Sequence, residues 1–146
     1  MRIYLDACCL QRPFDDQTQP RIRVEAEAVL AILAAVQAGD VTLVTSEALE
    51  FEIGRIPDEQ GRSEALAMLS LASERRVIEA KDEAAANALV ASGFSAMDAL
   101  HVALASRATV DYFATTEDKL LRRAASSSAL ACQPIALLSL VSEVNK

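Results

Sequence analysis

The sequence predicts an α/β fold in which a mainly parallel sheet of roughly five strands is covered by helices on both faces. Short apolar runs alternate along the chain with longer segments of helical periodicity, and no hairpin signal joins consecutive strand candidates. Strands that follow one another in this way need crossover connections. Such connections favour parallel pairing and a sheet that is buried on both sides.

The first predicted element is a short strand. Residues 3–5 form an apolar run, and the polar stretch 11–20, which contains two prolines, predicts a long loop after that strand. Apolar residues then recur at helical spacing from Ile22 to Gln37, and the following Gly39 is typical of a helix C-cap. The chain therefore opens with a strand, a loop and a long helix.

The rest of the chain continues the alternation. A second strand is expected at 41–44, and Thr45 or Ser46 caps a helix that Pro57 ends. The further predicted elements are helices at 62–75, 82–91 and 96–105, strands at 77–79 and 110–114, a helix from Thr115 onwards, and a short strand and a helix within 134–144.

Composition and length indicate one globular domain that spans residues 1–146. Hydrophobic residues make up 52% of the chain, which excludes an intrinsically disordered protein. The three cysteines form neither a disulfide framework nor a CxxC zinc motif, and neither a signal peptide nor a membrane-spanning run is evident. We therefore expect a soluble, cytoplasmic protein without a membrane partner. The net charge of -7 argues against a surface that coats nucleic acid generally, but it allows a local basic rim.

Four carboxylates stand at segment junctions: Asp6, Glu52, Asp98 and Asp118. In open parallel sheets, functional sites form beyond the carboxyl ends of the strands, and these acids map to that edge. Clustered carboxylates repel one another, so a cluster is tolerated mainly when a divalent metal ion supplies the balancing charge. The pattern therefore predicts a metal site.

Three of these acids also have a purely structural interpretation. Asp98 lies three residues after Ser95, and Asp118 lies three residues after Thr115, so each pair fits a variant of the capping box at a helix start. Glu52 fits the solvated face of a helix. Asp6 is different, because it is expected to end a strand and not to start a helix. Independent helix caps would not require all four acids to converge, and this convergence favours the metal site.

Four motifs occur in a fixed order along the chain: Tyr4-Leu-Asp6, Ser46 with Glu52 six residues later, Asp98-Ala-Leu-His-Val-Ala, and Thr116-Glu-Asp118. With these motifs the chain resembles, essentially end to end, the PIN-domain ribonucleases, and in particular the VapC-like toxins of toxin-antitoxin systems. The resemblance implies a PIN-like three-layer α/β/α sandwich with a mainly parallel sheet.

The resemblance also implies a function. It is that of a metal-dependent endoribonuclease, the toxin of a type II toxin-antitoxin pair, which hydrolyses RNA phosphodiester bonds with a metal-activated water. The acidic quartet Asp6, Glu52, Asp98 and Asp118 would hold one or two Mg²⁺ or Mn²⁺ ions, because such ions prefer oxygen ligands. Proteins of this kind usually form homodimers and are silenced by an antitoxin. The alternative is a non-catalytic PIN-like module that binds RNA or protein.

Several further residues are assigned with less direct signals. Glu117 is the alternative to Asp118 as the fourth metal ligand. If it is not a ligand, Glu117 is expected to lie beside the acids, as are Ser46 and Thr116. Cys8 stands where the family more often has Ser, Thr or Asn. The only histidine, His101, is expected to be a hydrogen-bonded core residue and not a catalytic one.

Basic side chains and apolar helices point to binding surfaces. The candidates for contacts with RNA phosphates are Arg12, Lys119 and Arg122. The helices predicted at 22–37 and 62–75 are the candidate surfaces for a homodimer.

Overall fold

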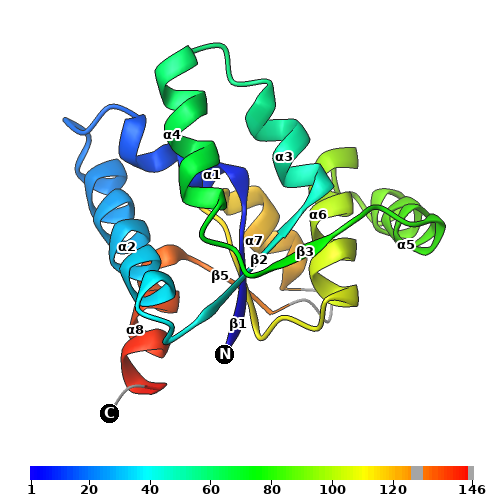
Figure 1. Cartoon of the computed structure of the whole chain (residues 1–146). Coiled ribbons are helices and arrows are strands. Elements are labelled where there is room, and N and C mark those ends of the chain that lie inside the picture. The colour runs from blue at the N-terminus through cyan, green and yellow to red at the C-terminus, as the bar shows by residue number, and fades with distance from the viewer. Residues whose placement is uncertain (126–129, 145–146) are drawn as a thin grey trace.

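The sheet is entirely parallel, with the strand order β3-β2-β1-β4-β5 (Figure 1). The computed structural model describes residues 1–125 and 130–144. The strands are β1 (Arg2–Leu5), β2 (Thr42–Ser46), β3 (Glu74–Arg76), β4 (Tyr112–Ala114) and β5 (Ala131–Cys132). The predicted α/β class with a parallel, five-stranded sheet is therefore confirmed.

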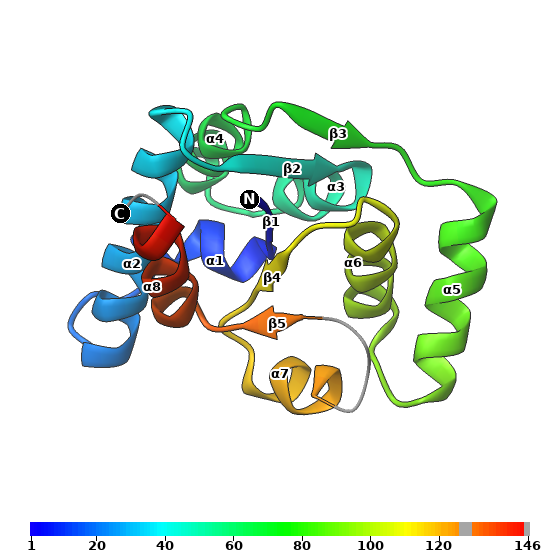
Figure 2. The same ribbon diagram turned by 90° about the horizontal axis from the view of Figure 1, so that it is seen from below.

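Helices cover both faces of the sheet. The helices are α1 (Ala7–Gln11), α2 (Pro20–Gln37), α3 (Glu47–Gly54), α4 (Glu59–Leu69), α5 (Ala80–Ala91), α6 (Ala96–Arg107), α7 (Asp118–Ala124) and α8 (Pro134–Val144), with a 3₁₀ turn, η1 (Arg12–Phe14), after α1. In Figure 2, α2 and α8 pack together on one side of the sheet and α5 and α6 on the other, which gives the three layers. Among the described residues, no helix is both long and apolar enough to cross a membrane.

The segment after β1 differs from the prediction. A long loop was expected there, but the helix α1 begins directly after the strand, and Asp6 is its N-cap. The four residues Ala-Cys-Cys-Leu at 7–10 are too few to show helical periodicity, so the polar stretch that follows dominated the pattern. The prediction that Asp6 ends a strand without starting a helix is therefore wrong.

The edge of the sheet also differs from the prediction. Helix α4 ends at Leu69 and not at residue 75, and β3 is the charged segment Glu74–Arg76 and not residues 77–79. A strand of sequence Glu-Arg-Arg carries no β-propensity signal, and its position is set by pairing with β2, where Val44 lies opposite Glu74. The last strand, β5, precedes Pro134 and does not lie within 134–144.

Candidate metal centre

The candidate metal centre lies at the carboxyl edge of the sheet, where β1, β2 and β4 end and α1, α3 and α7 begin (Figure 1). Asp6 follows β1, Glu52 lies on α3, and Asp98 lies in the first turn of α6. Glu117 and Asp118 stand at the start of α7. Acids from four separate segments therefore surround this edge.

Asp6 is fixed from both sides of its carboxylate. Its side chain is buried, Oδ1 accepts the amide hydrogen of Ala7 at 2.9 Å, and Oδ2 accepts the hydroxyl hydrogen of Thr115 at 2.9 Å. The thiol of Cys8 donates to the same Oδ2 at 3.4 Å. Asp6 therefore caps a helix and presents a preoriented carboxylate at the same time.

Thr115 was expected to cap a helix, with Thr116 beside the acids, but the N-cap of α7 is Glu117 and Thr115 instead contacts Asp6. The register of β1 and β4 places Leu5 opposite Ala114, so the residues that follow the two strands, Asp6 and Thr115, lie side by side. This equivalence between strand ends is the signal that identifies Thr115. Thr116 is buried, and its backbone amide donates to Cys8 Sγ at 3.4 Å.

The side chain of His101 lies between the carboxylates of Glu52 and Asp6. Glu52 Oε1 lies 2.7 Å from His101 Nε2, and the same nitrogen lies 3.9 Å from Asp6 Oδ1. His101 is completely buried, and its Nδ1 bonds the hydroxyl of Tyr4 at 2.7 Å. His101 is therefore the hydrogen-bonded core residue that the sequence predicts, but its contact with Glu52 was not foreseen.

Ser46, predicted to lie beside the acids, is buried at the end of β2. Its Oγ accepts the amide hydrogen of Leu49 at 3.2 Å, so it is the N-cap of α3, the helix that carries Glu52. The hydroxyl of Tyr4 lies 2.7 Å from the same oxygen. Ser46 therefore acts on the site through the position of α3.

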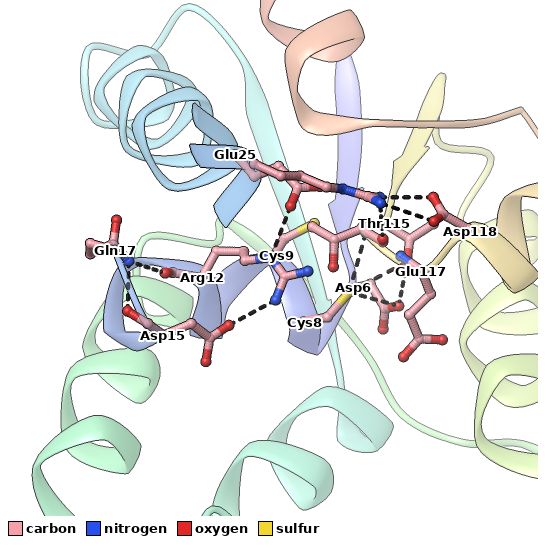
Figure 3. Close-up of polar contacts among 12 residues, drawn as sticks. Asp6, Cys8, Cys9, Arg12, Asp15, Gln17, Glu25, Thr115, Glu117 and Asp118 are labelled. Carbon is pink, nitrogen blue, oxygen red and sulfur yellow. Dashed lines mark hydrogen bonds and ion pairs between the residues drawn. The ribbon is translucent and has the colours of Figure 1, made fainter. Parts of the chain in front are cut away.

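The two adjacent acids at the start of α7 have different surroundings. Both carboxylate oxygens of Asp118 accept hydrogen bonds from the Arg21 guanidinium, at 2.9 and 2.7 Å, and these bonds lower the pKa of Asp118. In Figure 3, the Glu117 side chain extends toward Asp6, while the Asp118 carboxylate is turned away from it. Burial, and then the negative charges of Asp98 and Asp6, raise the pKa of Glu117 to about 7. Of these two residues, Glu117 has the environment of a metal ligand.

Asp98 contributes charge to the same region. Its backbone amide bonds Ser95 Oγ at 3.3 Å, so Ser95 is the helix cap that the spacing predicts. The charge of Asp98 raises the pKa of both Asp6 and Glu117, although burial is the larger cause for each. The carboxylates therefore destabilise one another's ionised forms.

The donor atoms fit a divalent metal ion. Within the described ranges, ligand atoms of Asp6, Glu52 and His101 lie within 4.8 Å of one another, and so do those of Asp6, Cys8 and Glu117. Asp6 belongs to both groups. Carboxylate oxygens are the preferred ligands of Mg²⁺ and Mn²⁺, and a bound cation balances the charge that raises these pKa values.

The predicted RNA contacts differ in their availability. Arg12 donates to Asp15 at 2.9 Å and to the buried Glu25 at 3.1 Å, so its charge is balanced locally (Figure 3). Lys119 and Arg122 instead line a surface hollow of about 370 Å³ beside Ser92 and Arg123. This hollow is a concentration of positive charge in a chain whose net charge is -7.

No protein-family model matches the sequence, and no curated protein matches it significantly. Solved structures nevertheless share its architecture. FitAcB from Neisseria gonorrhoeae aligns with a TM-score of 0.61 at 18% identity, over 91% of this chain and 98% of that chain. VapBC2 from Rickettsia felis, solved with a DNA fragment from its promoter, has a TM-score of 0.61 at 12% identity, with the same coverage of 91% and 98%.

PAE2754 from Pyrobaculum aerophilum aligns over 98% of this chain and 99% of that chain, with a TM-score of 0.53 at 14% identity. These structures match the whole sandwich and not a single layer of it. The chain therefore has the fold of the VapC-like PIN-domain toxins.

Proposed function

We propose that this protein is a divalent-metal-dependent endoribonuclease and the toxin of a toxin-antitoxin pair. The observation that carries the proposal is the group of carboxylates from separate segments at the carboxyl edge of the sheet, two of which have raised pKa values. Such an arrangement is unfavourable for folding alone, because the acids repel one another. It becomes favourable when a cation is bound.

In this proposal, Asp6, Glu52, Asp98 and Glu117 hold one or two Mg²⁺ or Mn²⁺ ions. When bound, such an ion supplies a Lewis acid that activates water and stabilises the leaving oxygen of a phosphodiester. The Ala7 amide and the Thr115 hydroxyl keep the carboxylate of Asp6 in one orientation. Asp118 would join this set only after release from Arg21.

Contacts to RNA are proposed beside the acids, at the hollow lined by Lys119 and Arg122. Lys119 lies in the first turn of α7, two residues after Glu117 in the chain, so phosphates held at the hollow would be near the carboxylates. Phosphate contacts fix the position of a nucleic acid without reading its sequence. Arg12 is the weaker candidate, because Asp15 and Glu25 already balance its charge.

The decisive experiment compares Asp6→Asn with Asp40→Asn. An asparagine oxygen can still accept the Ala7 amide hydrogen, so α1 keeps its cap, whereas Asp40 is exposed just before β2, at the opposite edge of the sheet. RNA cleavage with Mg²⁺ or Mn²⁺ should fall at least about 100-fold in Asp6→Asn and remain unchanged in Asp40→Asn, since even the partners of metal ligands contribute roughly 10- to 100-fold.

Two outcomes of this experiment reject the proposal in different ways. Cleavage by Asp6→Asn at the wild-type rate, or cleavage that EDTA does not inhibit, would reject the metal-dependent nuclease. Calorimetric binding of Mn²⁺ by a wild-type protein that cuts no RNA would leave the non-catalytic binding module instead.

The proposed partners are a second copy of the chain and an antitoxin in the cytoplasm. Exposed apolar side chains on α2 (Val24 and Leu30) and on α4 (Leu66) support these helices as the dimer surface. A single-chain mass in light scattering at micromolar concentration would contradict the dimer. The antitoxin would co-purify when its neighbouring gene is expressed with this one, and failure to do so would count against the pair.

A further inference from the structure

A series of short hydrogen bonds connects the start of α3 with Glu52 through the core. The hydroxyl of Tyr4 lies 2.7 Å from Ser46 Oγ and 2.7 Å from His101 Nδ1, and His101 Nε2 lies 2.7 Å from Glu52 Oε1. Tyr4, Ser46 and His101 are each 0% exposed, so these three side chains have to satisfy one another's donors and acceptors.

The direction of these hydrogen bonds is set at Ser46. Its Oγ accepts the amide hydrogen of Leu49 at the start of α3, and in the described part of the chain its own hydrogen has one acceptor, the oxygen of Tyr4. Tyr4 therefore donates to His101 Nδ1, which must carry a lone pair. The ring hydrogen of the neutral imidazole is then on Nε2 and is directed at Glu52.

The opposite direction is less favourable. If His101 Nδ1 carried the hydrogen, Tyr4 would donate to Ser46, and the Ser46 hydrogen would be left without an acceptor at a fully buried position. An unsatisfied buried donor destabilises the folded state. The hydrogen-bond pattern thus selects one tautomer of the histidine.

We infer that His101 is a positioning residue for Glu52 and not a ligand of the metal ion. This inference rests on the proposed metal site. Because Nε2 bears a hydrogen, its lone pair is not available to a cation, and the ion is surrounded by oxygen donors on this side of the site. The hydrogen bond holds one oxygen of Glu52 and leaves the other free to bind. On this side of the site, a set of oxygen donors without imidazole favours Mg²⁺ and Mn²⁺ over metals that prefer imidazole.

The first test reads the tautomer directly. His101 is the only histidine in the chain, so ¹⁵N-labelled protein contains a single imidazole, and its long-range proton–nitrogen correlations show which nitrogen bears the hydrogen. The expected spectrum has a protonated Nε2 and a bare Nδ1, before and after addition of Mg²⁺ alone. A hydrogen on Nδ1, or loss of the Nε2 hydrogen when Mg²⁺ is added, would overturn the inference.

The second test compares two amide side chains at position 101. In His101→Gln, the amide nitrogen reaches about as far as Nε2 and can donate to Glu52, whereas the shorter amide of His101→Asn cannot. Mn²⁺ affinity, measured from the spin-resonance signal of the free ion, should stay within about 3-fold of wild type in His101→Gln and fall about 10-fold or more in His101→Asn.

Each alternative role of His101 gives a different result. Wild-type affinity in His101→Asn would reject the positioning role, and an equal loss in both variants would identify the imidazole itself as a ligand. Thermal unfolding checks that both variants fold, and the spectrum of the wild type decides if either does not. Neither test of His101 measures RNA cleavage. Failure of the nuclease proposal is recognised separately, in Asp6→Asn: the variant would then bind Mn²⁺ as tightly as wild type or cut RNA at the wild-type rate.

Discussion

Replacing Glu117 with glutamine should make the metal-free protein more stable at neutral and alkaline pH. The pKa of Glu117 is raised from 4.5 to about 7 by burial and by the neighbouring carboxylates. Below about pH 4.5 the side chain is protonated in the folded and unfolded states alike, so it has no effect on stability. Between about pH 4.5 and 7 it ionises in the unfolded state first, and the folded state loses stability as the pH rises. Above about pH 7 the loss is constant.

The size of the effect follows from the shift. Each pKa unit corresponds to about 1.4 kcal/mol, so the full shift from 4.5 to about 7 would correspond to roughly 3.5 kcal/mol. The side chain as a whole is exposed and the protein covers only part of its carboxyl group, so solvent weakens these interactions and we expect about 1–2 kcal/mol. Glu117→Gln should gain this amount in free energy of unfolding at about pH 8 and gain nothing at about pH 4.

Urea denaturation at several pH values, without metal and with Mn²⁺, measures this gain. Mn²⁺ should stabilise the wild type more than Glu117→Gln, since the variant lacks one proposed ligand. The matched control is Asp118→Asn, which removes an exposed ion pair with Arg21 and should change the free energy of unfolding little, with no gain at high pH. If Glu117→Gln is no more stable than wild type at about pH 8, burial and the neighbouring carboxylates do not penalise the ionised form of Glu117, and the raised pKa is refuted.

Two further predictions concern the core and the basic hollow. Tyr4→Phe should lower the free energy of unfolding by about 1–3 kcal/mol, because it leaves polar groups of Ser46 and His101 without a partner. The other tyrosine, half-buried Tyr112, is the control, and a loss in Tyr112→Phe as large as in Tyr4→Phe would contradict this account. The double variant Lys119→Ala/Arg122→Ala should bind RNA about 10-fold more weakly with a smaller salt dependence, because counterion release falls. Unchanged RNA affinity with unchanged salt dependence would remove the hollow from the proposed site.

The sequence predicts the layers of this fold well because their signals are local. The apolar positions of α2 recur within one helix, and the alternation of strands and helices requires no knowledge of distant contacts. A strand was predicted near β3, but its bounds could not be, because the charged residues of β3 are placed by their partners, such as Arg2 beside Glu74. The position of β3 depends on a contact between segments 72 residues apart.

The candidate site was predicted to the level of the segment but not of the side chain. Glu117 and Asp118 are adjacent, and their directions depend on Arg21, which is 97 residues from Asp118 in the sequence. The contact of His101 with Glu52 likewise joins helices 49 residues apart. Spacing along one helix identifies which residues share a face, but it does not identify what lies opposite that face.

The capping role of Asp6 affects how this protein should be compared with relatives that have lost activity. Selection for a stable α1 preserves an acid at position 6 even in a lineage that no longer binds metal, because the same carboxylate begins the helix. An aspartate at position 6 of a relative is therefore poor evidence that the relative is an active enzyme. Glu117 is more informative, since its raised pKa makes it a burden on the folded chain. A lineage freed from metal binding would be expected to replace Glu117 early and to keep Asp6.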